Sequence, residues 1–177
     1  MNPDLQLLQA AQQGDQSAFS QLVGRYQQPL LRAMLPVTNT PEEAQDVVQD
    51  TFVQAYRNLD TFRGDSSFFT WIYRIAFNLA NARKRRKRPI SIDTTKLSLP
   101  SSDPSAEKRF EGVEFRSELR KAISQLSTDH QQVIILRELD ELEYEEIAAS
   151  LGLSVGTVRS RLHRARAQLR NLLKEWL

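Results

Sequence analysis

The chain has 177 residues, of which 40% are hydrophobic and 26% are charged. This length allows one domain or two small ones, and the composition supports only a modest core. The absence of cysteine excludes disulfides, thiolate zinc sites, iron–sulfur clusters and a thiol nucleophile. The two isolated histidines, His130 and His163, cannot build a metal centre, and no apolar run approaches the roughly 18 residues of a membrane span. The polar N-terminal sequence does not resemble a signal peptide, so we expect a soluble, intracellular protein.

Charge is segregated along the chain, although the net charge is only +2. Residues 1–60 carry seven acids and three bases, whereas residues 83–88 are six consecutive bases. Residues 138–146 hold six acids, and the following 24 residues hold no acid but five arginines. Blocks of one sign are typical of surfaces for different partners. The two basic segments therefore predict two contacts with one polyanion.

Apolar spacings of three and four residues, together with few glycines and prolines, predict an all-α protein. We expect helices over residues 3–13, 16–36, 41–57, 67–87, 108–125, 128–138, 144–151 and 155–174. The Ser- and Pro-rich sequence after residue 88 lacks this periodicity and predicts a flexible linker. The expected organisation is two small helical domains, residues 1–88 and 109–177, joined by a linker over residues 89–108.

The helix predicted over residues 41–57 has an acidic outer face. Its inner stripe is predicted to consist of Ala44, Val47, Val48, Thr51, Ala55 and Tyr56. Its outer face carries Glu42, Asp46, Gln49, Asp50, Val53 and Arg57. An acidic face repels DNA, so this face either contacts water or binds a protein partner. The residues by themselves leave both options open.

Residues 62–77 hold six of the fourteen aromatic side chains of the chain. On the helix that follows, the predicted core stripe is Phe68, Phe69, Ile72, Ile75, Ala76 and Leu79. The predicted outward arc is Trp71, Arg74, Asn78, Asn81 and Arg85, and the basic run 83–88 follows it. Aromatic faces beside cations suit single-stranded nucleic acid, because bases stack on rings while Lys and Arg contact phosphates. The alternative is structural, with aromatics in the core and a basic helix end favoured by the helix dipole.

Residues 144–170 are typical of a helix-turn-helix. A short helix meets a tight turn at residues 152–154, where Ser154 can cap the next helix. That helix is predicted to bury one stripe, namely Val155, Val158, Leu162, Ala165, Leu169 and Leu172. Its opposite face collects Gly156, Thr157, Arg159, Ser160, His163, Arg164 and Arg170, with Arg161 and Arg166 at the edges. Such a face fits a major groove, where arginine binds guanine and phosphates. A solvated basic helix is the alternative.

These motifs resemble a known family. The segment EEAQDVVQDTFVQAYRNLDTFRGDSSFFTWIYRIAFNLANARKRRKR is similar to domain two of the extracytoplasmic-function (ECF) sigma factors of bacterial RNA polymerase. The segment LSTDHQQVIILRELDELEYEEIAASLGLSVGTVRSRLHRARAQLRNLL resembles their domain four. Both resemblances occur in one chain and in the family's order.

The resemblance implies three interfaces. It implies docking on the clamp helices of the largest polymerase subunit through Asp46, Gln49, Asp50 and Val53. It implies capture of a flipped base of the minus-ten element near Phe62 and the following loop. The predicted minus-ten residues are Phe62, Asp65, Ser66, Ser67, Phe68, Trp71, Arg74, Asn78, Arg83 and Arg85. The predicted minus-35 residues are Thr157, Arg159, Ser160, Arg161, His163, Arg164 and Arg166.

The sequence therefore predicts a cytoplasmic initiation factor that binds core polymerase, recognises a bipartite promoter and assists its melting. We expect no catalytic residue, metal or cofactor, because no catalytic constellation and no Gly-rich phosphate loop is visible. Expected partners are core RNA polymerase (clamp helices and flap), promoter DNA and an anti-sigma factor, with no membrane insertion and no further regulatory domain. A DNA-binding regulator that recruits no polymerase is the first alternative, and a structural helical adaptor is the second.

Overall fold

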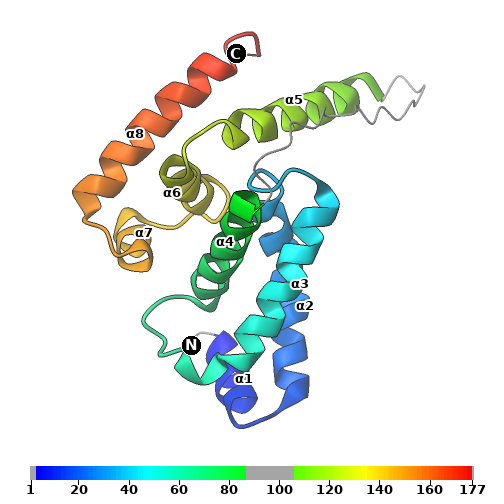
Figure 1. Ribbon diagram of the computed structural model, residues 1–177, viewed down its shortest axis with the longest axis vertical. Helices are drawn as coiled ribbons and strands as arrows, with labels where there is room; N and C mark the ends of the chain where they lie inside the picture. The colour runs from blue at the N-terminus through cyan, green and yellow to red at the C-terminus, as the bar shows by residue number, and fades with distance from the viewer. Residues whose placement is uncertain (1–2, 87–105, 177) are drawn as a thin grey trace.

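The computed structural model describes residues 3–86 and 106–176, and within these ranges it contains helices and no strand (Figure 1). The N-terminal half comprises α1 (Pro3–Gln12), α2 (Gln16–Met34), α3 (Pro41–Arg57), the short 3-10 helix η1 (Leu59–Thr61) and α4 (Phe68–Arg86). The C-terminal half comprises α5 (Ala106–Ser124), α6 (Thr128–Glu138), α7 (Tyr144–Leu151) and α8 (Val155–Leu172). The all-α prediction is confirmed. Most of the predicted linker lies outside the described residues, and its last part, residues 106–108, belongs to α5.

Local chemistry sets several of the helix ends. The Thr40 hydroxyl accepts a hydrogen bond from the backbone N–H of Glu43 and caps α3, whose first residue is Pro41. Ser154 caps α8 in the same way, by accepting from the backbone N–H of Thr157. Gly152 ends α7 with a φ of 65°, a left-handed conformation that glycine adopts without strain. The turn that defines the helix-turn-helix is therefore built from local residues.

The N-terminal half is a bundle in which α4 packs against both α2 and α3. Because two helices cover it, α4 buries a wider arc than the single predicted stripe: Tyr73, Phe77 and Ala80 are buried, whereas Ile75 and Leu79 are only half-buried. On α3, Phe52 is buried. The prediction that Tyr56 points inward is wrong, since it is 42% exposed with its ring against that of Phe19.

Hydrogen bonds connect helix α1 to this bundle. Arg25 and Tyr26 of α2 both donate hydrogen bonds to the carboxylate of Asp4, which is buried. The side chain of Gln12 donates to the backbone carbonyls of Leu59 and Phe62, at 3.0 and 3.1 Å. These bonds hold η1 and the start of the loop that leads into α4.

The C-terminal half is built around α6, whose residues Val133, Ile134, Ile135 and Leu136 are all buried. Helices α7 and α8 both pack on it. On α8 the predicted stripe is buried at Val158, Leu162 and Ala165. At the end of the helix the prediction is wrong: Leu172 is 43% exposed and Leu173 is buried in its place. The helix ends at Leu172, and the spacing of four residues from Ala165 through Leu169 continues to Leu173.

Candidate nucleic-acid and polymerase interfaces

The outward face of α8 carries basic and hydroxyl side chains toward solvent. Arg159, His163 and Arg164 are exposed, and the side chains of Arg159 and Arg164 form no ion pair or hydrogen bond with the described residues. Ser160 is also exposed, and its hydroxyl donates to the backbone carbonyl of Thr157 at 3.0 Å. The two arginines are therefore available to bond with a ligand without first losing a partner.

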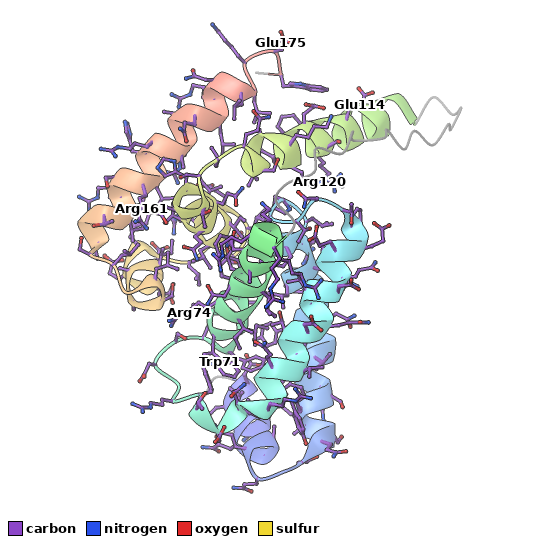
Figure 2. All side chains as sticks on the ribbon, in the orientation of Figure 1. Trp71, Arg74, Glu114, Arg120, Arg161 and Glu175 are labelled. Carbon is purple, nitrogen blue, oxygen red and sulfur yellow. The ribbon has the colours of Figure 1, made fainter. Side chains whose placement is uncertain are left out.

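The two arginines predicted at the edges of this face are paired with α6. Arg161 Nη2 lies 2.6 Å from Asp129 Oδ2 at the start of α6. Figure 2 labels Arg161 on α8. Arg166 donates through Nε and Nη2 to Glu138 Oε1 at the end of α6, at 3.0 and 2.6 Å. The hydrogen bond to this carboxylate raises the pKa of Arg166 above its ordinary value. These pairs orient α8 on α6, and each must be broken or shared before its arginine can contact DNA.

A shallow cavity of about 290 Å³ opens beside the basic face of α8. It is lined by Tyr144, Arg159, His163, Arg166, Ala167 and Arg170. Tyr144 begins α7, and Arg137 of α6 lies with its guanidinium carbon 5.3 Å from the centre of the Tyr144 ring. Tyr144 is not among the predicted site residues, and Arg170 was predicted on the exposed face of this helix without a role. An aromatic residue at the start of an acidic helix was the only signal for Tyr144.

The aromatic residues of the N-terminal half form one cluster at the start of α4. The ring of Phe62 lies 5.2 Å from that of Trp71 and 5.9 Å from that of Phe68, between centroids. Phe68 is 2% exposed, so its ring supports the cluster from inside and is not accessible to a base. Phe62 and Trp71 are half-buried and keep part of their surface open. These two rings are therefore the accessible aromatic surface of the cluster.

The loop and the outward arc of α4 surround this cluster. Asp65 is exposed and Ser66 is half-buried, whereas the Ser67 hydroxyl accepts from the backbone N–H of Thr70 and caps the helix start. Arg74 and Asn78 are exposed on α4, and Figure 2 shows Trp71 and Arg74 on this helix. The predicted minus-ten residues therefore lie on the loop and the outward arc of α4, except for the buried Phe68 and for Arg83, which is paired with α3.

At the basic end of α4, some side chains are paired with acids and others are exposed to solvent. Arg83 Nη2 lies 2.5 Å from Asp50 Oδ2, and Arg83 Nη1 lies 3.7 Å from Asp46 Oδ2. Partial burial lowers the pKa of Lys84, and the nearby Glu43 carboxylate partly offsets this effect. Arg85 is exposed. The last two residues of the basic run, 87 and 88, lie outside the described residues.

The outer face of α3 combines carboxylates with exposed apolar surface. Asp46, Gln49 and Asp50 are exposed, and Val53 is 49% exposed one turn further along the helix. These four positions share one face, as predicted from their spacing. Val53 and the 42% exposed Tyr56 add apolar surface beside these carboxylates.

The described residues contain no group of three His, Cys, Asp or Glu side chains that could hold a metal ion. Over the same residues, none of the helices has the length and apolarity needed to cross a membrane. The arrangement consists of two exposed basic surfaces, one on α8 and one on α4, and one acidic surface on α3.

Two protein-family models match the chain. The model described as sigma-70 region 2 matches residues 22–90, and the model described as sigma-70, region 4 matches residues 116–169. The first match contains α3 and α4, and the second contains the helix-turn-helix. These regions define a helical protein of the sigma-70 type.

Relatives that align with nearly the whole chain show which group of sigma factors it belongs to. The RNA polymerase sigma-H factor of Pseudomonas aeruginosa is 38% identical, over 98% of this chain and 95% of the relative. The ECF RNA polymerase sigma-E factor of Escherichia coli K12 is 41% identical, over 95% of this chain and 93% of the relative. The chain therefore belongs to the ECF sigma factors, as the sequence resemblance indicated. It is a transcription initiation factor that associates with RNA polymerase and directs it to specific promoters.

Solved structures resemble both halves. CnrH in complex with the cytosolic domain of CnrY matches with a TM-score of 0.72 and 34% identity, over 97% of each chain. The sigma factor RpoE of Bartonella quintana, in complex with the anti-sigma factor NepR, matches with a TM-score of 0.64 and 27% identity. That match covers 87% of this chain and 97% of the other.

Proposed function

We propose that this ECF sigma factor recognises a bipartite promoter with two separate surfaces and docks on core polymerase with a third. The observation that carries the proposal is the coexistence of a basic recognition helix in α8 with an aromatic and basic surface on α4. A regulator that only binds duplex DNA needs the first surface and has no use for the second. In this proposal residues 1–88 form the polymerase-binding and minus-ten domain, and residues 109–177 form the minus-35 domain.

The minus-35 element is read by the outward face of α8. Arg159 and Arg164 are the principal base-reading residues, because both are exposed and unpaired among the described residues. Thr157, Ser160 and His163 lie beside them on the same face. Arg161 and Arg166 contact DNA phosphates after giving up their ion pairs with α6. Arg170 contacts a further phosphate.

The minus-ten element is engaged as unpaired bases beside α4, and this engagement assists melting. Phe62 and Trp71 offer ring surface, and Arg74 and Asn78 lie next to them. Stacking on an aromatic ring contributes about 1–3 kcal/mol per base. Holoenzymes with Phe62→Ala or Asn78→Ala should therefore show weaker permanganate reactivity of the melted region. Wild-type reactivity in both variants would leave the aromatic cluster with a structural role only.

The acidic face of α3 docks on the clamp helices of the largest polymerase subunit. The exposed carboxylates of Asp46 and Asp50 and the exposed apolar surface of Val53 support this assignment. Such a face suits a basic, partly apolar protein surface. The C-terminal half contacts the polymerase flap.

The chain has no enzymatic activity of its own, acts in the cytoplasm and is held inactive by an anti-sigma factor. The last point is supported by the Bartonella quintana relative, which was solved with such a partner. The decisive experiment is a binding assay with a promoter fragment, with and without core polymerase. Specific binding that requires core supports an initiation factor. Equal specific binding by the chain alone would instead favour a regulator that works without polymerase.

A further inference from the structure

The two halves of the described chain are in contact, and this contact contains two unusual polar groups. Their buried apolar residues belong to one cluster, which includes residues of α4 and α6. The hydroxyl of Tyr73 and the Oδ2 atom of Asp140 are buried without a hydrogen-bond partner among the described residues. Tyr73 belongs to α4, and Asp140 belongs to the turn between α6 and α7. Each group comes from a different half.

The carboxylate of Asp140 interacts electrostatically with residues of the N-terminal half. Its carboxylate raises the pKa of Tyr73, in addition to the larger effect of the burial of that hydroxyl. Burial raises the pKa of Asp140 to about 7, and the positive charge of Arg32 on α2 partly opposes this shift. The charged and titratable groups that interact with this carboxyl are thus Arg32 of α2 and Tyr73 of α4.

The contact between the two halves is less favourable when Asp140 is ionised. Asp140 is half-buried, and its buried Oδ2 atom loses its hydration without gaining a hydrogen bond from the described residues; the exposed Arg32 offsets only part of this cost. The apolar cluster that joins the halves favours the closed arrangement. The closed arrangement therefore combines a favourable apolar contact with one unfavourable ionised group.

We propose that the contact between the α6–α7 turn and α4 is a latch that holds the free chain closed, and that Asp140 sets its strength. The inference rests on the proposed function in one respect: two promoter elements can be read together only if the two halves separate. The latch must then open when the chain is loaded on polymerase. An ionised Asp140 favours opening, and a neutral side chain at this position favours closure.

The sign of the pH dependence follows from this geometry. In the open form Asp140 is solvated and has an ordinary carboxyl pKa of about 4. In the closed form the pKa is raised to about 7, so the closed form binds the proton more tightly. Closure is therefore strongest below pH 4, weakens as the pH rises toward 7, and changes little above that. Between pH 8 and pH 6 the closed-to-open ratio should rise about tenfold.

The test measures the distance between the halves of the full chain. Since the sequence contains no cysteine, labels can be placed at the exposed positions Gln28→Cys on α2 and Asn171→Cys on α8. Asp140→Asn is the test variant, because it removes the charge and keeps the shape. Glu141→Gln is the matched control, because it removes the same charge from the adjacent, exposed residue.

We expect wild type and Glu141→Gln to shift toward longer distances between pH 6 and pH 8. Asp140→Asn should stay closed at both values. At pH 8 the closed-to-open ratio should be about a thousandfold higher in Asp140→Asn than in wild type, so Asp140→Asn should need more sigma factor for half-maximal transcription with core polymerase. Identical distance distributions and pH responses in wild type and Asp140→Asn would overturn the latch, as would an equal effect of Glu141→Gln. If wild type itself supports no promoter-specific transcription, the proposed function fails while the distance measurement still decides the latch.

Discussion

Arg159 and Arg161 lie on the same helix, yet the structure predicts different consequences for their removal. Arg159 is exposed and has no partner among the described residues, whereas Arg161 is paired with Asp129 at 2.6 Å. If Arg159 makes a bidentate contact with a guanine, Arg159→Ala should cost about 1–3 kcal/mol at the preferred minus-35 sequence. That corresponds to roughly a fivefold to 150-fold loss. The loss should be confined to one base pair, so the preference at that position disappears.

Arg161→Ala should cost less, because the wild-type arginine must give up an ion pair before it can reach a phosphate. An exposed pair of this kind contributes about 0.2–1 kcal/mol, and its side chains are 26% and 56% exposed. Asp129→Asn, which releases Arg161 in advance, should therefore strengthen binding slightly and equally for all sequences. The assay is transcription by reconstituted holoenzyme from a library of minus-35 sequences at several salt concentrations. A uniform loss across the library for Arg159→Ala would refute base reading by this residue and would reduce the domain to a nonspecific clamp.

The remaining predictions concern docking, charge and stability. Val53→Glu should abolish co-purification with core polymerase and leave the melting temperature unchanged, since Val53 is exposed on α3; wild-type recovery with core would contradict the docking surface. Arg85→Ala should weaken binding to all promoters alike and lower the log–log salt slope by about one, as measured by titration with salt. Leu162→Ala should destabilise the C-terminal half by about 2–5 kcal/mol in denaturant unfolding, because Leu162 is 1% exposed. A loss below about 1 kcal/mol would show that the packing of α8 is loose.

The sequence by itself determined the helices and their order. Each helix is specified by neighbours along the chain: Thr40 and Pro41 start α3, and Gly152 and Ser154 make the turn into α8. The exposed faces of α3 and α8 also followed from spacing, because the positions on a helix face are fixed by its period, except at Tyr56 and Leu172, which are exposed although they were predicted to be buried. These features depend on local geometry and were therefore predictable.

Only the tertiary structure decided which side chains have partners. Arg161 and Arg166 are paired with acids more than 25 positions away, on α6, and Arg83 is paired with Asp50 on α3. The wide buried arc of α4, which includes Tyr73, arises because helices on two sides cover it. Tyr73 and Asp140 are 67 positions apart in the sequence, and no local pattern could indicate that they meet. Spacing along one helix predicts which face is apolar, but the partner of a charge depends on how separate helices pack.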